Sequence, residues 1–93
     1  MSWLVRVRPE AELDVVVAAT WYESQRRGLG GEFVDEVSRT VASLADGPLQ
    51  NPETFEGVRR ILARRFPYSI TYQVVGEEVI VMSVLHMSRD RAR

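Results

Sequence analysis

The stretch that decides the fold runs from residue 57 to residue 90 and reads GVRRILARRFPYSITYQVVGEEVIVMSVLHMSRD. It holds three strand-like runs, at residues 58–66, 68–75 and 79–85, and the first of them is rich in arginine. The second run alternates, so Tyr68, Ile70, Tyr72 and Val74 share one face of a strand. The third is apolar on both faces, which indicates a strand that is central in its sheet or covered by helices. The segment Gly76-Glu77-Glu78 between them predicts a hairpin turn.

The residues before this stretch predict a strand and two helices. Residues 3–8 alternate as a half-buried strand does, and Pro9 both ends that strand and favours the first turn of a helix. Apolar residues then recur at helical spacing as far as Gly28, where the run GLGG at residues 28–31 predicts a helix stop and a turn. A second helical stripe begins at Phe33 and ends before Asp46-Gly47-Pro48.

The aperiodic segment at residues 48–57 contains two prolines and predicts a surface loop. The expected order is therefore strand, helix, helix, strand, strand, strand. The fold class is α+β, with a helical hairpin packed on one face of a mainly antiparallel sheet in a single domain, residues 1–93. The stripes predict a core made by the following side chains: Leu13, Val16, Val17, Trp21, Phe33, Val37, Val41 and Leu44 from the helices, and Ile70, Tyr72, Val74, Val81 and Leu85 from the strands.

Composition excludes several classes of function. Hydrophobic residues make up 45% of the chain and charged residues 27%, as in a globular protein. The sequence has no cysteine, which removes disulfides and thiolate chemistry. One histidine and scattered carboxylates form no metal-ligand cluster. We therefore expect no cofactor and no metal, and no membrane association. We also expect a cytoplasmic location, because the N-terminus lacks an export signal.

Charge is distributed unevenly, although the net charge is only -1. Residues 1–58 contain five Arg and ten acids, whereas residues 59–93 contain seven Arg and three acids. If the run at residues 58–66 is one strand, Arg60 and Arg64 share one face and Arg59 and Arg65 share the other. Such arginines hold phosphate or carboxylate groups through forked hydrogen bonds, or they lie in solvent.

Two runs resemble a known family. The run WYESQRRGLGGEF at residues 21–33 and the stretch quoted above resemble the RelE/ParE toxin superfamily, particularly its ParE-like branch. The resemblance extends from Pro9 to Asp90. The residues that carry it in the C-terminal stretch are Arg59, Arg60, Arg65, Phe66, Pro67, Tyr68, Tyr72, His86, Arg89 and Asp90. Many relatives continue with a proline and a tryptophan, whereas this chain ends with Arg91-Ala92-Arg93.

The resemblance implies the toxin component of a type II toxin–antitoxin system. ParE-like members are implied to poison DNA gyrase by binding it, without chemistry of their own. The alternative is a RelE-like ribosome-dependent endoribonuclease that acts on mRNA, for which His86, Arg60 and Arg65 are the candidate catalytic residues. A further alternative is a degenerate toxin that survives as a binding module. No lysine exists and no tyrosine follows His86, so the RelE-like complement is incomplete and gyrase inhibition is favoured.

The resemblance also implies a partner. A ParD-like antitoxin of the ribbon-helix-helix type is expected to form a hetero-oligomer with the chain. We expect its acidic, extended and partly helical segment to lie along the helical hairpin and the exposed sheet. The candidate partner-binding residues are Arg59, Arg60, Arg65 and Arg89.

Overall fold

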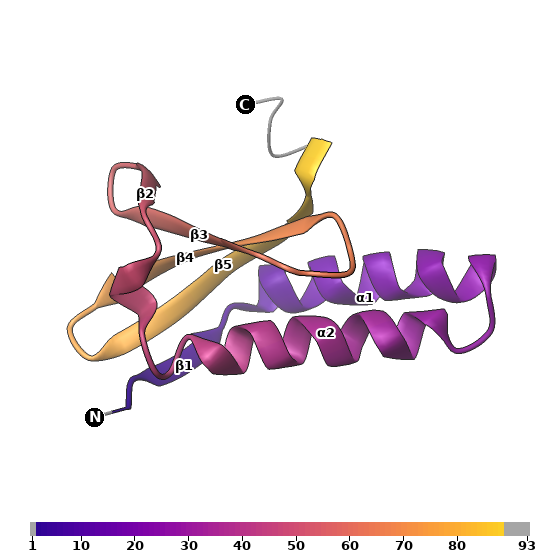
Figure 1. The fold of residues 1–93 in the computed structure, drawn as a ribbon, viewed down its shortest axis with the longest axis horizontal. Helices are drawn as coiled ribbons and strands as arrows, with labels where there is room; N and C mark the ends of the chain where they lie inside the picture. Colours follow the sequence, from indigo (N-terminus) through magenta and orange to yellow (C-terminus); the bar gives the residue numbers. More distant parts are fainter. Residues whose placement is uncertain (1, 89–93) are drawn as a thin grey trace.

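A computed structural model describes residues 2–88 of the chain. The elements follow in this order: β1 (Leu4–Val7), α1 (Pro9–Gln25), α2 (Leu29–Ser43), the short 3-10 helix η1 (Pro48–Gln50), β2 (Glu53–Phe55), β3 (Val58–Leu62), β4 (Tyr68–Val75) and β5 (Glu78–His86). The two helices form an antiparallel hairpin beside the strands (Figure 1). The expected α+β class and element order are confirmed.

The strands form one mixed sheet in the order β1-β5-β4-β3-β2. Only the β1–β5 pair is parallel, and the other three pairs are antiparallel. The apolar strand β5 lies between β1 and β4, as its two apolar faces predict. The β4–β5 register shifts between Thr71 and Tyr72, so that Met82 is an extra residue in β5. Strand β1 ends opposite Val81, and beyond this point Asp14 of α1 accepts a hydrogen bond from the Val84 N–H at 2.9 Å.

The core lies between the helical hairpin and one face of the sheet. Its fully enclosed side chains include Phe33 of α2, Ile70 and Tyr72 of β4, and Val79 and Val81 of β5. The predicted core residues Val37, Leu44 and Leu85 are also buried, and Val41 and Val74 pack against the cluster. Among residues 2–88 no helix combines the length and the apolar character needed to cross a membrane.

The predicted inner face of α1 is wrong. Leu13, Val16, Val17 and Trp21 remain 62%, 59%, 63% and 57% exposed, whereas Ala11 and Ala18 are buried. Apolar residues lie almost all around this helix, so its pattern allows two inner faces. The helix buries the face with small alanines, which lets its backbone approach α2 and β5 closely. The larger stripe is left in solvent.

Two expectations about the strands and the loop also need correction. Strand β3 ends at Leu62 instead of residue 66, so Arg64 and Arg65 lie beyond it and do not continue its alternation. The expected loop at residues 48–57 contains η1 and β2, and it is anchored by Pro48, whose carbonyl accepts a hydrogen bond from the buried Tyr72 hydroxyl.

The glycine run at residues 28–31 is not all turn, because α2 already begins at Leu29. Gly28 alone adopts the left-handed conformation, with φ of 88°. Gly30 is needed for a close approach between the helices, since an added Cβ there would lie 2.6 Å from the Ala19 carbonyl oxygen.

Candidate functional site

The sheet face away from the core carries the first candidate surface. The strand register places Arg60 opposite Thr71, and Thr71 opposite Ser83. A hollow of about 440 Å³ opens over these strands, and it is lined by Arg8, Thr54, Phe55, Val58, Arg60, Thr71, Met82 and Ser83. We call this surface the open face. Two guanidinium groups and the 64% exposed ring of Phe55 suit it to an acidic segment that carries apolar side chains.

Arg59 points to the other side of β3, where it holds the preceding loop. Its guanidinium donates hydrogen bonds to the carbonyl oxygens of Leu49, at 3.3 Å, and Asn51, at 2.5 Å. It also lies 3.9 Å from the Glu53 carboxylate, and only 21% of its side chain is exposed. These contacts give Arg59 a structural role in positioning η1 and β2.

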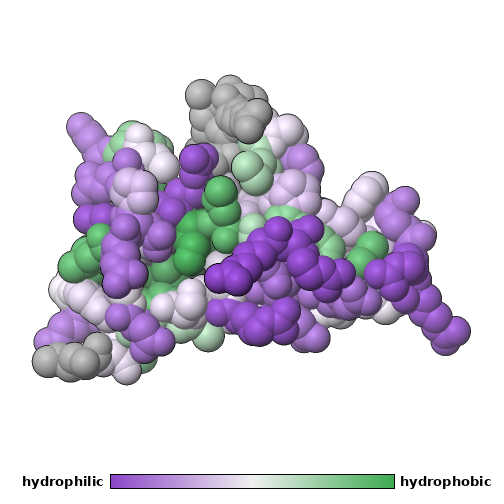
Figure 2. Space-filling model, in the orientation of Figure 1, coloured by the Kyte–Doolittle hydropathy of each residue, from purple (hydrophilic) through white to green (hydrophobic). Residues whose placement is uncertain are grey.

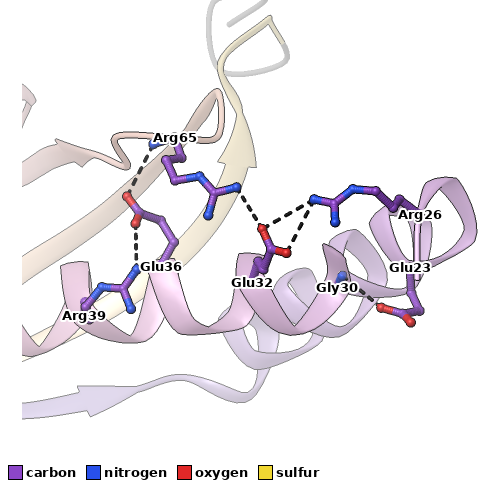
Figure 3. A network of polar contacts seen from close by, with 7 residues as sticks. All are labelled: Glu23, Arg26, Gly30, Glu32, Glu36, Arg39 and Arg65. Atoms are coloured by element: carbon purple, nitrogen blue, oxygen red, sulfur yellow. Dashed lines mark hydrogen bonds and ion pairs between the residues drawn. The ribbon is translucent and has the colours of Figure 1, made fainter. Parts of the chain in front are cut away.

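Arg65 belongs to a network of polar contacts on α2. Figure 3 shows the Glu32 carboxylate between the guanidinium groups of Arg65 and Arg26, at 2.8 and 3.4 Å. One turn along α2, the buried Glu36 accepts hydrogen bonds from the backbone N–H groups of Arg64, at 2.8 Å, and Arg65, at 3.4 Å. The network therefore ties the turn after β3 to α2.

These contacts also alter the acidity of both carboxyl groups. The pKa of Glu36 is lowered mainly by the backbone hydrogen bond from Arg64, against the opposing effect of burial. The pKa of Glu32 is lowered mainly by its hydrogen bond with the Arg65 side chain. Both carboxylates therefore stay ionised at neutral pH, and neither is suited to act as a general acid.

His86 lies at the end of β5, on the helix side of the sheet. It pairs with Tyr68 across the ladder, and the two rings meet edge to face with centroids 5.4 Å apart. Its Nδ1 accepts a hydrogen bond from the Ser88 N–H at 3.1 Å. The hollow next to the ring is lined by α1 residues that include Trp21.

The three candidate catalytic residues do not converge in the structure. Arg60 lines the open face, His86 lines a hollow beside α1, and Arg65 is paired with Glu32 on α2. An acid–base group and the cations that stabilise a reacting phosphate must meet at one point, and these residues meet at none. Arg89, the fourth candidate for partner binding, lies outside the described residues.

Two residues that shape these surfaces, Arg8 and Glu36, were not identified by the sequence-based prediction. Arg8 joins Arg60 on the open face because β1 returns parallel to β5, a pairing that the strand pattern does not specify. Glu36 lies three residues after Phe33 and one before Val37, on the buried side of α2. A carboxylate on an apolar stripe is a signal that could have identified this buried anchor.

Figure 2 shows how the outer surface of α2 differs from its surroundings. Hydrophilic residues cover the helix, and apolar surface is visible between α2 and the strands behind it. The hollow between α2 and β3, about 340 Å³, is lined by Glu36, Arg39, Thr40, Ser43, Ile61, Leu62 and Arg64.

Within residues 2–88 no group of three or more His, Cys, Asp or Glu side chains is placed to hold a metal ion.

Comparison with known proteins identifies the family. Residues 5–91 match the family model described as ParE toxin of type II toxin–antitoxin system, parDE. The chain belongs to the ParE toxin family. Because that match spans almost the entire sequence, the protein is a type II toxin, as the resemblance implied.

Solved structures share the ParE fold at low sequence identity. One comes from the chromosomal ParDE toxin–antitoxin system of P. aeruginosa, with a TM-score of 0.81, 20% identity, and coverage of 91% of this chain and 96% of that one. Another comes from the RelBE2 toxin–antitoxin complex of Mycobacterium tuberculosis, with a TM-score of 0.62, 18% identity, and coverage of 92% and 99%. No curated protein sequence matches the chain significantly.

Proposed function

We propose that this ParE-family toxin inhibits DNA gyrase by binding it, and that a ParD-like antitoxin neutralises it. The observation that carries the proposal is the separation of the candidate catalytic residues. His86 and Arg60 lie on opposite sides of the sheet, and Arg65 is held by Glu32. The part of the chain that the structure describes, residues 2–88, assembles no acid, base and phosphate clamp, and this supports a toxin that acts by binding.

Ribonuclease activity of the RelE type is the second candidate, because the RelBE2 complex shares the fold. The open face could hold RNA phosphates through Arg8 and Arg60. Its lining residues within the described range 2–88 include no histidine, lysine or tyrosine, so none of these side chains is suited to accept or donate a proton near neutral pH.

The mutation His86→Ala separates these two functions. Gyrase inhibition predicts that growth arrest on induced expression stays within a few-fold of wild type, with DNA damage response and filamentation. A nuclease that used His86 would lose about 10² to 10⁴ in rate. Growth arrest and protein synthesis, scored together in bacteria that express equal amounts of folded protein, distinguish them. Abolished toxicity in a folded His86→Ala variant would favour the nuclease.

The proposed antitoxin segment is acidic and extended, and it lies on the open face. Arg60 and Arg8 would pair with its carboxylates, and the exposed Phe55 would pack against its apolar side chains. Arg59 and Arg65 are not among the residues that line the open face, which makes these two residues secondary contributors. A ribbon-helix-helix domain elsewhere in the antitoxin would link two such complexes into a hetero-oligomer.

The charge reversal Arg60→Glu tests this site. It should weaken antitoxin binding by at least about tenfold and reduce the salt dependence of association, because an attractive charge becomes repulsive. Arg27→Glu is the matched control, since Arg27 is exposed and lies at the far end of the hairpin. Titration calorimetry at several ionic strengths measures the antitoxin affinity of each variant and its salt dependence. Equal antitoxin affinities of the two variants would exclude the open face as the antitoxin-binding site.

A further inference from the structure

Two adjoining hollows lie along the side of α2 that faces β3. The first, of about 340 Å³, lies between α2 and the end of β3, and the second, of about 230 Å³, lies between the C-terminal end of α2 and η1. Ser43 and Ile61 line both hollows, so the two form one groove, which we call the α2–β3 groove. Together they reach the size of a small-molecule site, for which about 300 to 1,000 Å³ is usual.

The first hollow is suited to an anionic group. Arg39 and Arg64 line it, and the buried Glu36 positions both of them. The Glu36 carboxylate accepts a hydrogen bond from the Arg39 guanidinium at 3.1 Å, as Figure 3 shows, and another from the Arg64 backbone N–H at 2.8 Å. Arg39 therefore keeps most of its five N–H donors for a ligand. The Arg64 guanidinium has no hydrogen bond or ion pair with any residue in the range 2–88.

The charge of this end favours a phosphate over a carboxylate. Glu36 uses both of its oxygens within the chain, so the two guanidinium groups face the ligand together. A phosphate monoester carries about −1.5 to −2 charges at pH 7 and offers three acceptor oxygens. It can therefore bind Arg39 and Arg64 at once through forked hydrogen bonds.

The second hollow offers mainly hydrogen-bond acceptors. Asp46, Gln50 and Asn51 line it. The Asn51 amide N–H donates to the Tyr72 hydroxyl at 3.0 Å, which leaves the side-chain oxygen of Asn51 as an acceptor. Within residues 2–88 the side chains of Asp46 and Gln50 make no hydrogen bond or ion pair. Carboxylate and amide side chains of this kind recognise the edges of nucleobases.

The strip between the two ends combines hydroxyl groups with apolar surface. Thr40 and Ser43 donate to helix carbonyl oxygens at 2.9 and 2.6 Å, so each hydroxyl oxygen can still accept a hydrogen bond from a ligand. Ile61 and the 45% exposed Leu62 supply the apolar surface. Sugar hydroxyls can donate to the first pair, and a flat ring can pack on the second.

We propose that the α2–β3 groove binds a nucleoside monophosphate, with guanine preferred as the base. The phosphate would bind Arg39 and Arg64. The ribose would lie beside Ser43, one helical turn or about 6 Å along α2 from Arg39, and the base would lie over Ile61 toward η1. Guanine presents neighbouring N–H donors that match the two oxygens of the Asp46 carboxylate, whereas adenine presents an amino group beside an acceptor.

This groove is separate from the open face. No residue that lines either of its hollows also lines the open face. The inference does not depend on gyrase inhibition, because it follows from α2, β3 and η1 alone. The same ligand chemistry occurs in a free nucleotide and at the phosphorylated end of a nucleic acid strand.

NMR titrations of the isotope-labelled full chain test the proposal. GMP should bind at least about tenfold more tightly than guanosine, which lacks the phosphate, and than ribose phosphate, which lacks the base. It should bind at least about fivefold more tightly than AMP. The backbone signals that shift should include those of Leu62, Arg64 and Gln50. A dinucleotide with a phosphorylated guanosine end separates the two sources: tighter binding than GMP indicates a strand end, and weaker binding a free nucleotide.

Matched substitutions locate the two ends of the ligand. Arg64→Gln removes one guanidinium but keeps the backbone hydrogen bond to Glu36, and it should weaken GMP binding at least about tenfold. Arg27→Gln is the control, because Arg27 is exposed at the far end of the hairpin and should leave the affinity unchanged. Asp46→Asn should remove most of the preference for GMP over AMP. Spectra of the unliganded variants check that each keeps its fold.

Four results would overturn the proposal. The first is no GMP binding at about 1 mM, where even weak specific sites are occupied. The second is equal affinity for GMP and ribose phosphate, or equal affinity of the Arg64→Gln and Arg27→Gln variants for GMP. The third is a set of GMP-dependent shifts centred on Arg60, which would place the nucleotide on the open face. The fourth is tighter binding of a glutamate-rich peptide than of GMP, since the groove would then hold an acidic protein segment.

Discussion

Replacing Phe33 with alanine should lower the free energy of unfolding by about 3–5 kcal/mol, the usual effect of removing a large core ring. Phe33 is fully buried, and its ring centroid lies 5.2 Å from that of Tyr22, 5.2 Å from that of Phe66 and 4.9 Å from that of Tyr68. These contacts join both helices to the turn before β4. Loss of the ring therefore leaves a cavity where three segments of the chain meet.

Trp21→Ala is the matched control for this prediction. Trp21 is the larger side chain but is 57% exposed, so its truncation should change the free energy of unfolding by no more than about 1 kcal/mol. Urea denaturation followed by circular dichroism compares the two. If Phe33→Ala does not fold, Phe33→Leu should still fold with a smaller loss. A larger effect at Trp21 than at Phe33 would contradict the observed orientation of α1.

The second large effect concerns two neighbouring glycines. Gly30→Ala should destabilise the protein by about 1–3 kcal/mol, because the added Cβ would lie 2.6 Å from the backbone oxygen of Ala19 and force the helices apart. It would also crowd the Glu23 carboxylate, whose Oε1 accepts the Gly30 N–H at 3.0 Å. This contact, visible in Figure 3, helps to satisfy the N-terminus of α2.

Gly31→Ala should have the opposite effect on stability from Gly30→Ala. No atom lies within 4 Å of a Cβ added at Gly31. Alanine there reduces the freedom of the unfolded chain and should stabilise the fold by about 0.4–1 kcal/mol. Thermal melts of the two variants measure the difference. A Gly30→Ala variant as stable as Gly31→Ala would mean that α1 and α2 do not pack as closely as the structure has them.

The sequence was most informative where only one arrangement satisfied the pattern. The alternation of β4, the two apolar faces of β5 and the single stripe of α2 each had one solution, and Ile70, Val81 and Phe33 are buried as predicted. The pattern of helix α1 allowed two buried faces, because its alanines and its larger apolar residues lie on different sides. Packing against β5 decided between them, and local periodicity carries no information about that contact.

The candidate site was less predictable for a related reason. Neighbouring arginines look equivalent in sequence, but Arg59 is used by the loop at residues 49–53, Arg65 by Glu32, and Arg60 faces the open side. The strand end at Leu62 breaks the alternation on which the predicted pairing of Arg60 with Arg64 depended. Which surface each arginine lines therefore depends on tertiary contacts between segments that are far apart in the chain.

The most direct measurement is a supercoiling assay with purified DNA gyrase and the full chain, run beside a translation assay with purified ribosomes and mRNA. Gyrase inhibition by surface binding predicts loss of supercoiling by wild type and by His86→Ala alike, with the mRNA intact. Cleavage of ribosome-bound mRNA, with supercoiling unaffected, would contradict it.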